Sequence, residues 1–161
     1  MITASDLSAG YALNVRLIKR QTEGLSHADS LIQTPYNINS LNWVLGHIAV
    51  NRDNVLRALG VETLLTEAQT QRYIRDSEPV RQDGPDILKL EELLELLERG
   101  QAIIESEFKK LTPESLEREI EIGERSVTLG SRLFGLYFHD TYHTGQTDLL
   151  RQVAGINDKV I

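Results

Sequence analysis

The chain has 161 residues, of which 40% are hydrophobic and 25% are charged, and such a chain is typically a soluble globular protein with one core. Its net charge of −7 disfavours binding to the phosphate backbone of a nucleic acid. No apolar run approaches the roughly 20 residues of a membrane-spanning helix, and the absence of cysteine excludes disulfides and a cysteine nucleophile.

The first predicted helix begins at Ser5 or Asp6, both favourable N-cap residues, and ends at Gly24. Its buried residues recur at steps of three or four, or multiples of them: Leu7, Tyr11, Asn14, Ile18 and Leu25. A connector over residues 26–39 follows. The first residues lack the basic region and apolar run of a secretory signal, so we expect a cytoplasmic protein.

The second predicted helix begins with Asn39 or Ser40 as its cap and runs to about Leu59, with Gly60 as its stop signal. Its apolar stripe comprises Leu41, Leu45, Ile48, Val55 and Leu59. His47 lies at the flank of this stripe. That position suits a side chain that reaches sideways into a cavity, and it equally suits a partly exposed histidine.

A long connection over residues 61–86 follows, with a short helix predicted over 63–74 and a loop over 77–85. A connection of this length in a compact domain is typical of a crossover or a functional lid. The next long helix is predicted from about Asp86 to Leu111. Residues that recur at steps of three and four along this helix predict a core-packing face. They are Leu90, Leu94, Leu97, Gln101, Ile104, Phe108 and Leu111.

The last third of the chain starts with a connection at 112–114 and a segment over 116–122 that alternates apolar and charged residues, which predicts a short extended piece. The final helix begins near Ser126 or Thr128 and ends near Ala154, with Gly155 beyond its end.

Four long amphipathic segments predict an all-α protein in which residues 1–161 form one four-helix bundle. The connection over 61–86 is long enough to return along the bundle and leave the second and third helices parallel. We therefore expect an up-down-down-up order of the four helices.

Two of the four histidines, His139 and His143, are spaced four residues apart in the final helix. Helical geometry places their rings about 40° apart on one face, with Gln146 about 20° to the other side of His139. Apolar or small residues near the same angle are Gly135, Leu136, Leu150 and Val153, so the histidines are predicted to lie in the middle of the core-facing stripe.

Together with His47, this pair would make a three-histidine metal site with an open coordination position, the arrangement of a catalytic metal. A bound metal lowers the pKa of a coordinated water toward about 7. The spacing alone favours three unrelated histidines, one at the surface and two that make polar contacts in the core, because histidine pairs four residues apart are common.

The segment Ser40-Leu41-Asn42-Trp43-Val44-Leu45-Gly46-His47-Ile48-Ala49, taken with His139-x-x-x-His143-x-Gly145-Gln146, resembles the DinB/YfiT family. The likeness extends over nearly the whole chain. It implies a four-helix bundle of up-down-down-up order with a divalent metal ion, zinc or nickel among others, held by His47, His139 and His143.

The resemblance implies a metal-dependent hydrolase or a transferase of low-molecular-weight thiols, acting on a small-molecule substrate, and a homodimer is common in the family. It implies no DNA binding, and the net charge of −7 also disfavours it. The alternative is a non-catalytic, stress-related binding or interaction bundle.

Other polar residues near the histidine pair are weaker candidates. Asp140 would either orient His143 or remain an exposed acid, and Gln146 would either hydrogen-bond a bound water or substrate or bridge two helices. Arg132, two turns before His139, would either receive an anionic substrate or extend along the surface. His27 has no partner at metal spacing and is predicted to lie at the surface.

Overall fold

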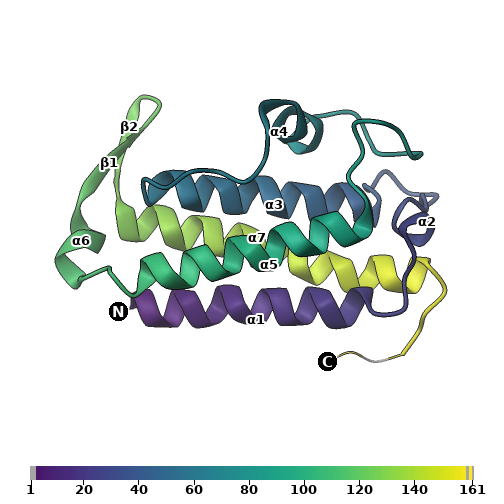
Figure 1. The fold of residues 1–161 in the computed structure, drawn as a ribbon, viewed down its shortest axis with the longest axis horizontal. Coiled ribbons are helices and arrows are strands. Elements are labelled where there is room, and N and C mark those ends of the chain that lie inside the picture. The colour runs from purple at the N-terminus through teal and green to yellow at the C-terminus, as the bar shows by residue number, and fades with distance from the viewer. Residues whose placement is uncertain (1–2, 159, 161) are drawn as a thin grey trace.

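Four long helices lie side by side and build a mostly helical molecule (Figure 1). The structure is a computed structural model that describes residues 3–158 and 160. The long helices are α1 (Ala4–Thr22), α3 (Leu41–Ala58), α5 (Leu90–Phe108) and α7 (Leu129–Val153). The connections carry α2 (His27–Ser30), α4 (Glu67–Tyr73), α6 (Pro113–Glu117), β1 (Glu119–Ile122) and β2 (Arg125–Thr128). Within the described part of the chain, no helix has the length and apolar character required to cross a membrane.

Local capping chemistry sets where the long helices begin. The side chains of Ser40 and Thr128 accept backbone N–H groups at the starts of α3 and α7, which confirms both predicted caps. The prediction of Ser5 or Asp6 as the cap of α1 is wrong, because Thr3 caps this helix. The carboxylate of Asp6 instead accepts the backbone N–H of Thr3 and completes a capping box.

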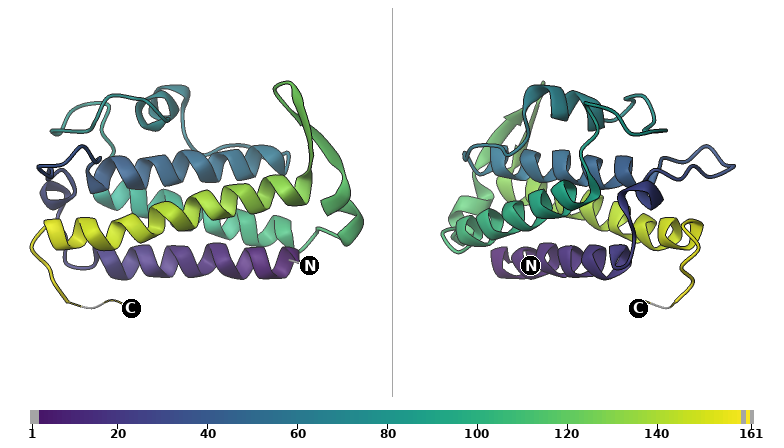
Figure 2. Two further views of the ribbon diagram at one scale, coloured as in Figure 1. Left: turned by 180° about the vertical axis from the view of Figure 1, so that it is seen from behind. Right: turned by 45° about the vertical axis from the view of Figure 1, so that its right-hand side comes forward.

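The connection between α3 and α5 lies over α3 and carries α4 (Figures 1 and 2). The carboxylate of Asp53 accepts the backbone N–H groups of Leu64 and Leu65, so α4 begins only after the cap Thr66 rather than at 63. The hydroxyl of Tyr73 accepts the backbone N–H of Leu88. This contact holds the segment before α5 in a non-helical course.

The third long helix therefore differs from its predicted bounds and face. α5 begins at Leu90 rather than near Asp86 and ends at Phe108. Leu93 is fully buried, whereas Leu94 is only partly buried. The predicted core-packing face is displaced because the packed face of α5 follows its contacts with α1 and α3.

The short extended piece predicted before Gly123 is β1, and it pairs with β2 in an antiparallel hairpin that the sequence pattern did not reveal. Glu119 lies opposite Thr128, and Ile122 lies opposite Arg125. Gly123 has a φ of 60° at the turn, a conformation that favours glycine. The hairpin projects from the end of the bundle where α7 begins (Figure 1).

α3 is the most deeply buried helix, because it packs against α5 and α7 and is covered by α4. The core of the bundle has two clusters of buried side chains along its length, one around Leu45 and Leu93 and one around Leu56 and Leu133. The left view of Figure 2 shows α3 and α7 next to each other. This contact brings the two segments that carry candidate ligands together.

Candidate metal centre

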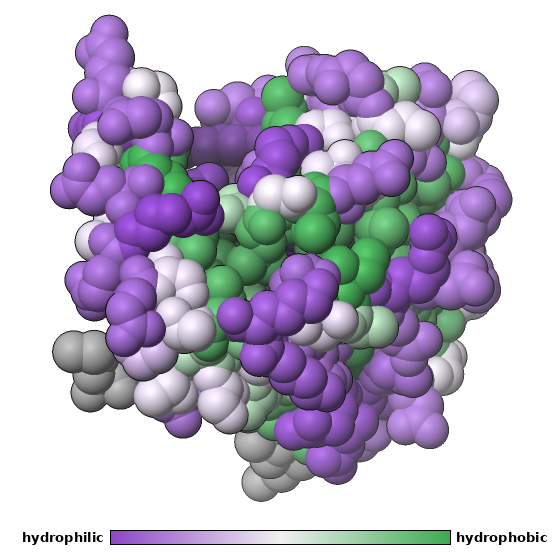
Figure 3. Space-filling view, turned by 60° about the vertical axis from the view of Figure 1, so that its left-hand side comes forward, coloured by the Kyte–Doolittle hydropathy of each residue, from purple (hydrophilic) through white to green (hydrophobic). Residues whose placement is uncertain are grey.

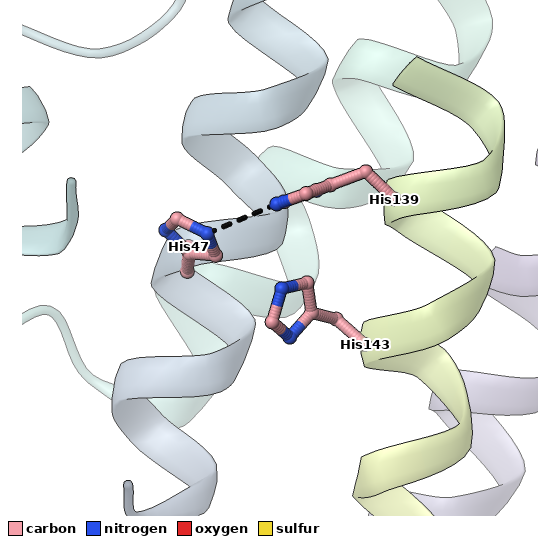
Figure 4. A group of neighbouring side chains, drawn as sticks. All are labelled: His47, His139 and His143. Carbon is pink, nitrogen blue, oxygen red and sulfur yellow. Dashed lines mark hydrogen bonds between the residues drawn. The ribbon is translucent and has the colours of Figure 1, made fainter. Parts of the chain in front are cut away.

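Three histidines from two helices meet between α3 and α7 (Figure 4). His47 comes from α3, and His139 and His143 come from successive turns of α7. One ring nitrogen of each residue lies within 4.8 Å of the corresponding nitrogens of the other two. The structure thus brings together the three residues that the sequence indicated, and this group could hold a metal ion.

His47 is held by the segment that lies over α3. Its Nδ1 is 2.8 Å from the backbone carbonyl oxygen of Tyr73. Since a carbonyl only accepts, Nδ1 carries the hydrogen and the neutral ring has its lone pair on Nε2. The indole of Trp43 stacks on the imidazole, with ring centroids 4.6 Å apart and planes inclined by 16°. Only 8% of His47 is exposed, so the structure selects the buried alternative for this residue.

His143 is oriented by a residue of its own helix. Its Nδ1 lies 2.7 Å from Oε1 of Gln146, which accepts the hydrogen bond. The lone pair of the neutral ring is again left on Nε2. Gln146 therefore fixes the ring of His143 instead of bridging two helices. Such an outer hydrogen bond is the usual companion of a histidine ligand.

His139 completes the group. Its Nε2 lies 3.2 Å from Nε2 of His47, as the dashed line in Figure 4 shows. Its Nδ1 is buried and has no hydrogen-bond partner among the described residues. Lone pairs of His47 and His143 thus face one small space beside a third imidazole. A cation in that space would satisfy these lone pairs, so the donor set fits a metal ion.

Burial disfavours the protonated form of all three imidazoles. Desolvation lowers the pKa of His47 against the opposing effect of its bond to the Tyr73 carbonyl, and the neighbouring His143 lowers it further. The pKa of His139 falls to about 4, mainly because of burial, with contributions from His143, His47 and Arg132. Burial also lowers the pKa of His143, against the opposing effect of its bond to Gln146. A histidine binds a metal ion through its neutral imidazole, so these lowered pKa values favour metal binding near pH 7.

The buried face of α7 differs from the predicted one. Its centre runs through Leu136, Asp140, Thr144 and Thr147, and His139 and His143 lie at its edge and are partly exposed. Gly135 is exposed, and Val153 is 39% exposed. The polar residues of the buried face are satisfied by hydrogen bonds, which an apolar-stripe count does not register. The histidines consequently combine partial burial with access from outside.

Asp140 is fully buried, so the reading of this residue as an exposed acid is wrong. One carboxylate oxygen accepts a hydrogen bond from the side chain of Asn14 at 2.7 Å, and the other accepts one from Nε of Arg52 at 2.9 Å. Among the described residues, no hydrogen bond joins Asp140 to His143. The carboxylate instead connects α7 with α1 and α3 directly behind the histidines.

The remaining candidates lie outside the histidine group. His27 accepts the backbone N–H of Leu90 through Nδ1, and its Nε2 lies 3.2 Å from Asp83. Its side chain is only 17% exposed, so the predicted surface position is corrected to a contact at the start of α5. Arg132 is partly buried and lines a pocket near the hairpin. Tyr142 is 60% exposed, and its ring meets the ring of His143 edge-on.

Sequence reasoning missed the contribution of Tyr73, whose carbonyl orients His47. The signal that could have found it is Gly46, directly before His47. A Cβ atom on Gly46 would lie 2.1 Å from the ring of Tyr73, so only glycine admits this ring against α3. A glycine within a helix beside a candidate ligand indicates close packing of another segment.

Comparison with known proteins shows a family match and a similar fold. The family model described as the DinB superfamily matches residues 16–147. No curated protein sequence matches the chain. A solved structure titled "Crystal structure of the conserved protein of locus from Enterococcus faecalis" is similar in fold, with a TM-score of 0.74 and 18% sequence identity over 96% of this chain and 98% of that one.

Proposed function

Because this chain belongs to the DinB superfamily, we propose that it is a metal-dependent enzyme that acts on a small molecule. One divalent ion would be held by Nε2 of His47, His139 and His143. The observation that carries this proposal is that one ring nitrogen of each histidine lies within 4.8 Å of the other two. The carbonyl of Tyr73 and the side chain of Gln146 bind Nδ1 of His47 and His143, which leaves the lone pair of each ring on Nε2.

The donor set favours an open site of the catalytic kind. Three imidazoles suit zinc and nickel alike. Within the described chain, the group that could hold a metal contains these three histidines and no fourth ligand. Three protein ligands with a free position are typical of catalytic rather than structural metal centres. His139 and His143 are both partly exposed, which supports access of a small molecule to that position.

A divalent ion in such a site supplies Lewis-acid chemistry, which polarises a carbonyl or makes a water or a thiol more acidic. The residues of the chain have a positioning role. Tyr73 and Gln146 hold the Nδ1 hydrogens of His47 and His143, so each ring presents its Nε2 without rotation. We propose either hydrolysis of a small substrate or transfer of a low-molecular-weight thiol to an electrophile. Because the chain has no cysteine, the thiol must come from a cosubstrate.

The proposal extends to the organisation of the chain. We propose that residues 1–161 form one cytoplasmic domain whose long helices follow an up-down-down-up order. The length and course of the connection between α3 and α5 support this order. A homodimer is the expected assembly by family resemblance. The alternative is a non-catalytic binding bundle, and an ion closed off from substrates would favour it.

The decisive experiment measures metal content in protein purified without a metal-affinity tag. We expect one divalent ion per chain in the unaltered protein and loss of most of it in His139→Ala, because two remaining imidazoles hold a metal weakly. His27→Ala is the matched control, since His27 lies outside the group, and it should retain the ion. Unchanged stoichiometry in His139→Ala would contradict the ligand assignment.

Turnover assays then separate the two reactions. The metal-loaded protein is incubated with low-molecular-weight thiols and a model electrophile, and in parallel with simple esters and amides. Turnover of one class that disappears in His143→Ala identifies the reaction. If neither panel shows metal-dependent turnover, the non-catalytic alternative gains support.

A further inference from the structure

A second feature lies near the hairpin, where α3 ends and α7 begins. An open pocket of about 520 Å³ is bordered by the end of α3, the strand β1 and the start of α7. Three arginines line it: Arg57 of α3, Arg118 directly before β1, and Arg132 of α7. Figure 3 brings this end of the molecule forward and shows hydrophilic and hydrophobic residues side by side where the projecting hairpin meets the helical body.

The charges of these arginines are not balanced by ion pairs. Among the described residues, no carboxylate lies within salt-bridge distance of Arg57, Arg118 or Arg132, whereas the buried Arg52 is paired with Asp140. Arg57 donates a hydrogen bond to the side-chain oxygen of Asn54 at 2.7 Å, and that amide is neutral.

Glu121 is the only acidic residue among those that line the pocket. The local balance is therefore three positive charges against one negative, in a chain whose overall charge is −7. A pocket with this balance attracts anions.

The pocket is aligned with the histidine group. Asn54 follows His47 by seven residues on α3, and Arg132 precedes His139 by seven residues on α7. Two helical turns return within about 20° to the same face and advance about 10 Å along the axis. Gly135 lies between Arg132 and His139 on α7 and is exposed, so no side chain at this position separates the two residues.

We propose that Arg57, Arg118 and Arg132 bind the anionic end of the molecule whose reactive group lies at the histidines. The recognised chemistry is a carboxylate or a phosphate, because the guanidinium fork donates two parallel hydrogen bonds to either group. The offset of Arg132 and His139 along α7, about 10 Å, favours molecules with a comparable distance between the anion and the reactive group. The link to the histidines rests on the proposed function, and the anion site itself does not.

The first test measures anion binding to the full chain with metal loaded and again after chelation. Inorganic phosphate and succinate are titrated separately while the side-chain Nε–Hε signals of arginine are followed by NMR. We expect saturable shifts of Arg57, Arg118 and Arg132 with at least one probe, and the preferred probe identifies phosphate or carboxylate as the ligand group. Binding that persists after chelation separates this site from the metal.

Substitutions assign the binding to the pocket. Arg132→Gln should weaken it by about tenfold, the loss expected for one charge-assisted contact. Arg132→Lys keeps the positive charge but loses the two parallel N–H donors of the guanidinium, so it should also weaken anion binding. The matched control is Arg16→Gln, which removes the same charge from an exposed position on α1 outside the pocket lining. Equal affinity in Arg132→Gln and Arg16→Gln would overturn the proposal.

The second test concerns the link to the histidines. Linear mercapto-carboxylates of increasing chain length are titrated into the metal-loaded protein, with the thiol intended for the histidine group and the carboxylate for the arginines. We expect the affinity to peak near a span of about 10 Å and the peak to vanish in Arg132→Gln. Affinity independent of length would overturn the link. Failure of the metal assignment alone would leave binding of the free anions unchanged.

Discussion

Arg52 of α3 and Asp140 of α7 form an ion pair inside the bundle, with Nε and Oδ2 2.9 Å apart and side-chain exposures of 2% and 0%. A second guanidinium nitrogen of Arg52 donates to the backbone carbonyl of Tyr11 at 3.2 Å. Asp140 directly follows His139. The pair therefore fixes the two helices that carry the histidines against each other, immediately behind the candidate metal centre.

We predict that Asp140→Ala lowers the free energy of unfolding by about 3–5 kcal/mol, because it leaves the charge of Arg52 buried and unpaired. Chemical denaturation of the metal-free protein measures the change. The control is Glu105→Ala, which removes a carboxylate from the exposed pair with Lys109 and should cost less than about 1 kcal/mol. Similar losses in the two variants would show that the buried pair has no special role.

A second prediction concerns Gln146, whose Oε1 fixes the ring of His143. Gln146→Leu should weaken metal binding by about 10- to 100-fold, because the ring loses the acceptor that sets its tautomer and orientation. Competition with a chelator of known affinity measures the change. Gln152→Leu makes the same substitution at an exposed position of α7 and should have little effect. Unaltered affinity in Gln146→Leu would mean that His143 is oriented by its packing alone.

The sequence predicts well what depends on neighbouring residues. The caps Ser40 and Thr128 act through hydrogen bonds to residues three positions away, so local spacing reveals them. The histidine spacing on α7 likewise depends only on helical geometry. His47 joins this pair through tertiary packing, and its assignment as a partner rested on the family resemblance rather than on periodicity.

What the sequence did not predict depends on contacts between distant segments. α5 begins late because the hydroxyl of Tyr73 holds the backbone of Leu88, a contact across the long connection. Asp140 was not recognised as a core residue because its partner Arg52 lies 88 positions away. Periodicity counts apolar residues, so a buried face of satisfied polar groups escapes it.

A third prediction concerns pH. In the metal-free folded protein the pKa of His139 is about 4, compared with its ordinary value of 6.5. Between these pH values the unfolded chain binds more protons than the folded one, so the free energy of unfolding should decrease as the pH falls from about 6.5 to 4. Denaturation at a series of pH values measures this slope. In His139→Gln the slope over the same window should be shallower, and an identical slope would contradict the assignment.

The last prediction uses two glycines that flank the histidines. A Cβ on Gly46 would lie 2.1 Å from the ring of Tyr73, and Tyr73 is fully buried, so the ring has little room to move. Gly46→Ala should lower the free energy of unfolding by about 1–3 kcal/mol and weaken metal binding, because the displaced Tyr73 carbonyl no longer holds His47.

The matched substitution is Gly145→Ala on α7, where an added Cβ meets no atom within 4 Å. In a helix interior, alanine is favoured over glycine by about 0.5–1 kcal/mol, so this variant should be slightly more stable than the parent protein. Denaturation and chelator competition on both variants test the pair together. If Gly46→Ala retained full stability and metal affinity, the close contact of Tyr73 with α3 would not be what holds His47 in place.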